Sequence, residues 1–314
     1  MSEPPPAAFE SRYSFTSLTY AQAYRVAEES PAADEPTIAS DASPLALTAE
    51  SISEPAVVEP AHPELLRLMT IAGPDFGNAL HAIFEHRVIG ATMATQTDLI
   101  RRCLDEQALS LRDMPLDRLV ALVAARIQST LDAPLLLQSS AGLSLGKLKP
   151  QQLRAEMAFD FVLDDVSMTS LREACERHGE PALVPAGPLR ELRGLMTGKI
   201  DLVFEFNGRF HVLDYKSNRL GEHLSNYAAA ALVQAMDAHH YRFQALLYTV
   251  AVDRYLRQRI VNYSRREHLG EAIYLFVRAS GIDAQSGIWA RRFDDGLIDA
   301  VDVVLGRSTG KEIE

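Results

Sequence analysis

The chain has 314 residues, of which 47% are hydrophobic and 23% charged, and its formal net charge is −11. This length can hold one or two domains with a substantial core. The sequence shows neither an apolar run long enough to span a bilayer nor the basic start and hydrophobic core of a signal peptide, so we expect a cytoplasmic protein and not a membrane or secreted one.

The acidic charge is concentrated at the N-terminus. Residues 1–62 hold ten Asp and Glu against two Arg, a balance of −8 that leaves −3 for the remaining 252 residues. Residues 254–292 carry eight Arg against three acidic residues, a balance of +5. Such a stretch is typical of a phosphate-binding surface, and about equally of a solvated helix face or a surface for a protein subunit.

The composition also predicts the domain organisation. Residues 26–63 are dominated by Ala, Pro, Ser, Thr and Glu, which cannot bury enough surface to offset the entropy of ordering, so we expect a disordered linker. It separates a short N-terminal segment, residues 1–25, from a domain at residues 64–314. The two cysteines, Cys103 and Cys175, fit neither a disulfide framework nor the four ligands of an iron–sulfur cluster.

The first element of this domain is a predicted helix at residues 77–89. Leu80, Phe84 and Val88 fall along one stripe, and His81 and Glu85 lie one turn apart. A single histidine is more often structural or merely exposed than a metal ligand. The helical pattern alone therefore leaves the role of His81 open.

The next region, residues 97–150, is predicted to be helical and to pack on the core as an elaboration. Residues 154–163 then have the pattern of a strand. Glu156 in this strand could lie near a functional site, and an exposed position at a strand end is an equally good interpretation.

The most informative stretch is residues 198–216, which predicts a β-hairpin. Two apolar runs rich in β-branched and aromatic residues flank Asn207-Gly208, the strongest short signal for a type I′ turn, because both central residues there need positive φ. This turn fixes the register of the two strands. Asp201 then falls directly across from Asp214, about 5 Å away at Cβ, and Lys216 shares the same face.

Two carboxylates in this arrangement repel each other by about 3 kcal/mol at an effective dielectric near 20. A hard divalent cation such as Mg²⁺ would convert the repulsion into coordination. The alternative is a solvated hairpin face whose charges discourage edge pairing. We favour the metal site, because three apolar side chains share that face: Val203, Phe210 and Val212.

The C-terminal part completes the predicted order of elements. Residues 220–234 predict a helical or irregular insert, residues 235–259 a long helix, and residues 271–278 a strand. The full order is α-β-β-β-α-β. Within the long helix three polar or aromatic residues recur at helical spacing, a pattern more often found in a core than at a functional site: Tyr241, Gln244 and Tyr248.

Three segments in this order resemble a known family: I-D-L-V-F at residues 200–204, L-D-Y-K-S-N at residues 213–218 and Y-L-F-V-R at residues 274–278. They are similar to the D-x(n)-[D/E]-x-K signature of the PD-(D/E)XK nuclease superfamily, and more narrowly to the C-terminal nuclease domain of RecB, the β subunit of exodeoxyribonuclease V. The resemblance runs from about residue 72 to about residue 305. It implies an α/β restriction-endonuclease-like fold with a mixed central sheet and helical elaborations.

The resemblance also implies a site. Residues 77–85 resemble the family motif G-x-x-x-H-x-x-x-E, whose histidine is a metal ligand, so His81 is expected to bind the metal and Glu85 to orient it. Asp201, Asp214 and the backbone carbonyl of Tyr215 are expected to complete a Mg²⁺ site, with Lys216 as the fourth catalytic element. Residues 244–248 resemble the Q-x-x-x-Y motif that supports the active-site face, which makes secondary candidates of further side chains: Gln244, Tyr248 and, near the site, Glu156.

The implied activity is Mg²⁺-dependent hydrolysis of phosphodiester bonds in DNA. In the family this domain cuts single strands, as an exonuclease and endonuclease, within a complex that repairs double-strand breaks. The partners that the resemblance implies are DNA, RecC-like and RecD-like subunits, and the RecA recombinase. Residues 12–18 resemble the short strand that closes the helicase portion of RecB, so the chain is expected to begin at a domain junction and to lack the motor.

A nucleotide-binding loop would need G-x-x-x-x-G-K-[S/T]. Residues 306–312 are one residue short of it and end in Glu, so we expect no ATP hydrolysis by this chain. Two alternatives remain for its function. It could be a stand-alone nuclease that works without helicase partners, or a non-catalytic module that binds DNA or a subunit, as RecC does with the same fold. The complete set of site residues argues against the second: His81, Asp201, Asp214 and Lys216.

Overall fold

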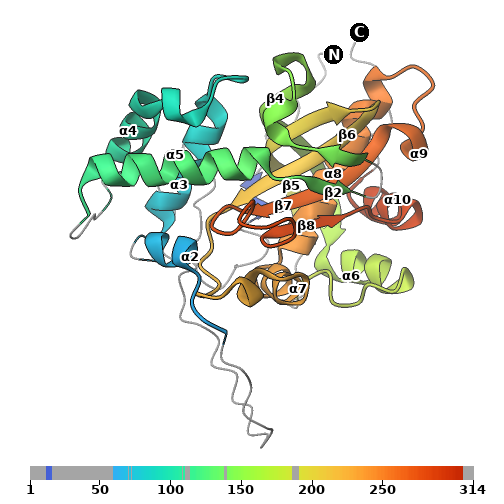
Figure 1. Cartoon of the computed structure of the whole chain (residues 1–314). Coiled ribbons are helices and arrows are strands. Elements are labelled where there is room, and N and C mark those ends of the chain that lie inside the picture. Colours follow the sequence, from blue (N-terminus) through green and yellow to red (C-terminus); the bar gives the residue numbers. More distant parts are fainter. Residues whose placement is uncertain are drawn as a thin grey trace, which may run out of the picture.

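The computed structural model describes residues 12–15, 59–69, 71, 73–107, 109, 114–137, 140–185 and 191–306 (Figure 1). Most of the predicted linker at residues 26–63 lies outside the described residues, as do residues 16–18 of the predicted junction strand and residues 307–312 of the near-miss loop. Among the described residues no helix combines the length and the apolar character that a bilayer span requires.

A mixed six-stranded sheet forms the centre of the molecule. Its strand order is β1-β5-β6-β7-β8, with β4 paired to the other side of β5. The β6–β7 pair and the short β1–β5 pair are parallel, and the other pairs are antiparallel. The strands are β1 (Arg12–Tyr13), β4 (Leu153–Ser167), β5 (Glu191–Phe206), β6 (Arg209–Lys216), β7 (Leu269–Phe276) and β8 (Ile288–Arg291).

Helices cover both faces of this sheet (Figure 1). One apolar cluster packs the sheet against helices on one face: α6 (Met168–Arg177), α7 (Ala229–Ala238), α8 (Tyr241–Arg259) and α10 (Asp295–Val304). A second cluster lies on the opposite face, with α3 (Pro74–His86), α4 (Thr97–Glu106) and α5 (Leu116–Asp132). Every residue of β7 is buried, as expected for an apolar strand in the middle of a sheet covered on both sides.

The remaining elements are short. They are the helices α2 (Pro63–Leu68) and α9 (Arg265–His268), the strands β2 (Leu135–Leu137) and β3 (Ser140–Leu143), and 3₁₀ turns at Met93–Thr95, Leu145–Lys147, Pro150–Gln152 and Leu224–Tyr227. The elements α3, β4, β5, β6, α8 and β7 follow one another in the predicted α-β-β-β-α-β order, so the predicted fold class is confirmed.

The β5–β6 hairpin has the predicted turn and register. Asn207 and Gly208 have φ of 53° and 79°, as a type I′ turn requires. Five Cα pairs follow the predicted register, from Phe206 with Arg209 to Leu202 with Leu213. The ladder ends there, while β6 stays paired with β7 as far as Lys216. The two strands therefore separate at the position of the two aspartates.

Three local predictions were wrong. Residues 135–143, predicted to be helical, form the β2–β3 hairpin, because a short apolar run does not distinguish a strand from a helix. The long helix predicted at residues 235–259 is broken between α7 and α8, where His240 takes a left-handed φ of 57°. Val88 is 64% exposed, because α3 ends two residues before it at His86.

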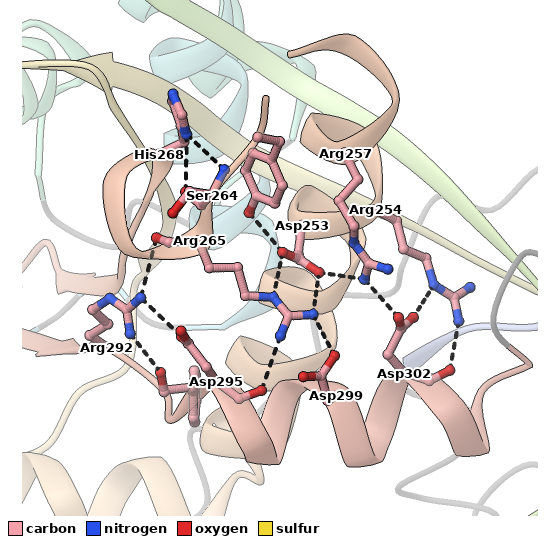
Figure 2. Close-up of polar contacts among 12 residues, drawn as sticks. Asp253, Arg254, Arg257, Ser264, Arg265, His268, Arg292, Asp295, Asp299 and Asp302 are labelled. Atoms are coloured by element: carbon pink, nitrogen blue, oxygen red, sulfur yellow. Dashed lines mark hydrogen bonds and ion pairs between the residues drawn. The ribbon is translucent and has the colours of Figure 1, made fainter. Parts of the chain in front are cut away.

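Most side chains of the arginine-rich stretch form ion pairs (Figure 2), whereas Arg259 and Arg266 are exposed. Asp253 in α8 and Asp302 in α10 are fully buried and are contacted by Arg254, Arg257 and Arg265. Arg265 also reaches Asp299, at 2.9 Å. These contacts join α8, the α9 turn and α10. These three aspartates lie just outside residues 254–292, so they do not enter the +5 charge balance of that stretch.

Candidate active site

The candidate site lies where β5 and β6 separate. Asp201 contributes from β5, and Asp214, Tyr215 and Lys216 from the end of β6. His81 reaches the same place from α3, a helix that begins with Pro74 and Asp75 in its first turn and buries the stripe Phe76, Leu80, Ile83 and Phe84. The ring of Phe84 stacks on Tyr215 with 3.7 Å between centroids, which fixes α3 against β6.

Asp201 connects the helix to the hairpin. Its Oδ2 lies 3.2 Å from Nδ1 of His81 and accepts a 2.7 Å hydrogen bond from the backbone N–H of Tyr215. Burial raises the pKa of Asp201, but the His81 ring and that N–H outweigh it, so the net pKa is lowered. Burial lowers the pKa of His81, but Asp201 and Asp214 reverse the effect and raise it to about 9.

Asp214 is the group that resists ionisation. It is 2% exposed, and burial together with the negative charge of Asp201 raises its pKa to about 6. Its Oδ1 forms an ion pair with Nζ of Lys216 at 2.6 Å, but has no hydrogen-bond partner of regular geometry among the described residues.

Lys216 is enclosed by groups that favour its charged form. Its Nζ donates to Oε1 of Gln244 at 3.2 Å and lies 4.1 Å from the centroid of the Tyr241 ring and 5.3 Å from that of Tyr274. Burial lowers the pKa of Lys216, but the Asp214 carboxylate outweighs it and the net pKa is raised. The ammonium group therefore stays protonated over the whole neutral range.

Gln244 holds this lysine through a second layer of contacts. Its Oε1 also accepts a 3.0 Å hydrogen bond from the hydroxyl of Tyr274, and its Nε2 donates to the hydroxyl of Tyr248 at 3.0 Å. Gln244 and Tyr248 are thus brought next to Lys216 by α8. The contacts of Tyr241 and Tyr274 with Lys216 were not predicted. The sequence marks Tyr241 only by its helical spacing and Tyr274 only as part of the Y-L-F-V-R segment, and the two reach the lysine from α8 and β7.

The two remaining candidates are placed differently. Ala155 pairs with Leu202 and Met157 with Ile200, so Glu156 lies opposite Asp201. Glu156 itself makes no ladder pair and has a left-handed φ of 49°. Burial and the charges of Asp201 and Glu85 raise its pKa. Glu85 is 39% exposed and lies 3.8 Å from His86, so in this structure Asp201, and not Glu85, contacts the His81 ring.

The donor set fits a hard divalent cation. An imidazole and two neighbouring carboxylates are ligands that Mg²⁺ or Mn²⁺ accepts. The buried Asp214 has an Oδ1 without a regular hydrogen bond among the described residues, and its pKa is raised in part by the charge of Asp201. With the side chains in these positions, no group of three or more His, Cys, Asp or Glu among the described residues has the geometry to coordinate one metal ion. His81 pairs with Asp201 while Asp214 is drawn toward Lys216, and a cation between them would compete with both ion pairs.

Comparisons with known proteins identify the family of the chain. The model of the PD-(D/E)XK nuclease superfamily matches residues 57–300. The RecBCD enzyme subunit RecB of Escherichia coli (strain K12) is 35% identical over 245 residues, which cover 76% of this chain and 20% of that protein. The subunit of the same name from Mycobacterium tuberculosis (strain CDC 1551 / Oshkosh) is 31% identical over 229 residues, covering 66% of this chain and 21% of the relative.

A third relative, the RecBCD enzyme subunit RecB of Haemophilus influenzae, is 32% identical over 172 residues, covering 54% of this chain and 14% of the relative. The chain thus spans about a fifth or less of the length of these relatives.

Proposed function

The chain belongs to the PD-(D/E)XK nuclease superfamily, and we propose that it is a Mg²⁺-dependent deoxyribonuclease that hydrolyses phosphodiester bonds in single-stranded DNA. The observation that carries the proposal is the pair of aspartates where β5 and β6 separate, one buried and one largely so, with the Lys216 ammonium 2.6 Å from Asp214. A cation-binding carboxylate pair beside a fixed positive charge suits a reaction in which negative charge develops on a phosphate.

Each group has a distinct task in this proposal. His81, Asp201, Asp214 and the backbone carbonyl of Tyr215 would hold the metal. Bound there, Mg²⁺ would lower the pKa of a water molecule and polarise the scissile phosphate. Lys216, kept protonated by Asp214, would stabilise the negative charge that develops in the transition state and orient the attacking water. Its raised pKa makes it unsuited to act as a general base.

The supporting residues act through Lys216. Gln244 directs the ammonium group through its 3.2 Å hydrogen bond and is itself oriented by the hydroxyls of Tyr248 and Tyr274. Glu156 is a secondary candidate, because burial and the nearby charge of Asp201 raise the pKa of its carboxylate, which also lies 3.7 Å from Nζ of Lys199. Glu85 keeps the weaker role of adding negative charge nearby.

The biological setting in this proposal is a RecBCD-type complex for repair of DNA double-strand breaks. The similarity to the RecBCD subunit RecB over 76% of the chain supports it. RecC-like and RecD-like subunits would then deliver the single strand, and RecA would be a further partner. No ATP hydrolysis is proposed for this chain. In this setting the chain acts as an exodeoxyribonuclease V-type nuclease module.

The test is cleavage of end-labelled single-stranded and duplex DNA by the purified chain, without ATP, in Mg²⁺ or in EDTA. We expect metal-dependent cutting of the single strand that Asp214→Ala and Lys216→Ala abolish. Asp105→Ala and Lys147→Ala remove exposed charges of the same types and should leave cutting unchanged. A folded wild-type chain that binds single-stranded DNA but does not cut it would contradict the proposal and favour a binding module.

A further inference from the structure

The N-terminal strand β1 belongs to the central sheet, although it is far from its partner strand β5 in the sequence. Arg12 and Tyr13 pair in parallel with Leu195 and Met196 of β5. At these positions β4 occupies the other side of β5, whereas β6 pairs only further along, from residue 202 onward. Residues 12–15 therefore fill the stretch of the β5 edge that β6 leaves open where the strands separate.

Two aromatic side chains anchor this segment. Tyr13 is 8% and Phe15 7% exposed, and both belong to the same apolar cluster as α8. The ring of Phe15 lies 6.0 Å from that of Phe243, centroid to centroid. Tyr13 ends the strand and Phe15 follows two residues later, where the backbone is already helical. Both rings are nevertheless buried in the same apolar cluster while the backbone of Arg12 and Tyr13 pairs with the edge of β5.

We propose that the β5 edge at Leu195 and Met196 is a strand-addition site for aromatic-x-aromatic peptides, and that residues 12–15 occupy it as a detachable anchor. Backbone pairing supplies affinity in this mode of recognition, and buried alternate side chains supply specificity. The occupant is this chain's own segment. The strand pairing and the two buried rings hold the segment on the domain, so a separate peptide of the same sequence should compete for the same site.

The anchor also lies next to the candidate active site. Phe243 immediately precedes Gln244, and both belong to the first turns of α8, which also carry Tyr241. Gln244 and Tyr241 are the groups that contact Lys216. A seated anchor therefore packs under the helical turn that positions the lysine. This coupling rests on the proposed nuclease function, whereas the binding site itself does not.

The decisive experiment compares one chain before and after a single cut. A recognition sequence for a site-specific protease is inserted between residues 40 and 41 of the full chain. Binding of a fluorescent peptide with the sequence of residues 9–19 is then followed by anisotropy. An attached competitor acts at an effective concentration on the order of millimolar, and the cut releases it to the micromolar concentration of the protein. We expect the peptide to bind at least ~10-fold more tightly after the cut.

The matched control is the same peptide with Ser in place of Tyr13 and Phe15, which should bind neither form. Equal binding of the native peptide before and after the cut, or no binding to the cut chain, would overturn the proposal. The full chain with Tyr13→Ser and Phe15→Ser should bind the native peptide without any cut. If that variant does not fold, the cut wild-type chain still decides, because its sequence at the site is unchanged.

The coupling to the active site has its own readout. In the Tyr13→Ser, Phe15→Ser chain we expect kcat for cleavage of single-stranded DNA to fall roughly tenfold with KM little changed, since a small misplacement of a catalytic group is costly. Added native peptide should restore kcat, which a merely misfolded chain would not allow. A kcat equal to wild type would overturn the coupling. If the wild-type chain itself shows no cleavage, the proposed function fails while the peptide-binding result stands.

Discussion

Metal binding at the candidate site should depend steeply on pH, because His81 holds a proton when no metal is bound. Its pKa of about 9 reflects the adjacent Asp201 and Asp214 carboxylates. A histidine must be neutral to bind a metal ion, so the cation has to displace that proton. At pH 7, two units below this pKa, the competition should weaken metal affinity roughly 100-fold, or about 3 kcal/mol.

The sign and range of the effect follow from the two pKa values. Affinity should rise about tenfold per pH unit from pH 6 to pH 9, as His81 loses its proton, and level off above. Below pH 6 the slope should steepen, because Asp214, with a pKa of about 6, then also holds a proton. Close to one proton should be released per metal ion at pH 7.

Isothermal titration calorimetry with Mn²⁺ or Mg²⁺, in buffers of different ionisation enthalpy, measures both the affinity and the proton release. The control is His81→Gln, whose affinity should be nearly constant between pH 7 and pH 9. A wild-type affinity that does not change over that range, with no net release of protons, would refute the reasoning.

Three further predictions concern single side chains. Gln244→Leu should lower single-turnover cleavage by ~10²-fold with nearly unchanged metal affinity, because it frees the Lys216 ammonium from its 3.2 Å hydrogen bond; equal losses of both would argue against this role. Asp253→Ala should lower the free energy of unfolding in urea by on the order of 2–3 kcal/mol, since it removes the fully buried carboxylate to which Arg257, Arg265 and the Tyr263 hydroxyl donate. Asp299→Ala removes a carboxylate that is itself 47% exposed and should cost about 1 kcal/mol or less. Gly208→Ala should cost about 1 kcal/mol by the same measurement, because φ there is 79°, and an unchanged stability would contradict the turn assignment.

Local signals made much of the fold predictable. The turn residues Asn207 and Gly208 determine the register of the hairpin, and the alternation of apolar residues determines its faces. The break between α7 and α8 could not be predicted, because nothing in the sequence marks His240 as left-handed. The separation of β5 from β6 is equally invisible, since it depends on Asp201 accepting the N–H of Tyr215 through its side chain.

The candidate site likewise has a part that could be predicted from the sequence and a part that could not. Asp201, Asp214 and Lys216 lie on one hairpin, so spacing alone places them together. The enclosure of Lys216 by Tyr241 and Tyr274 involves residues 25 or more positions away, for which no sequence pattern gives a distance. The arginine-rich stretch shows the same limit, because its charge is balanced by aspartates that only the packing of α8 on α10 brings near.

In the proposed mechanism the aspartates hold a metal ion, while Lys216 stabilises the charge that develops during the reaction. The most direct test measures metal affinity by calorimetry and cleavage of single-stranded DNA on the same preparation of Lys216→Met. We expect the variant to bind metal at least as tightly as wild type, since the ammonium group that competes for Asp214 is gone, and its cleavage to fall by at least ~100-fold. A variant that cleaves DNA at the wild-type rate, or one that loses metal binding and cleavage together, would contradict the account.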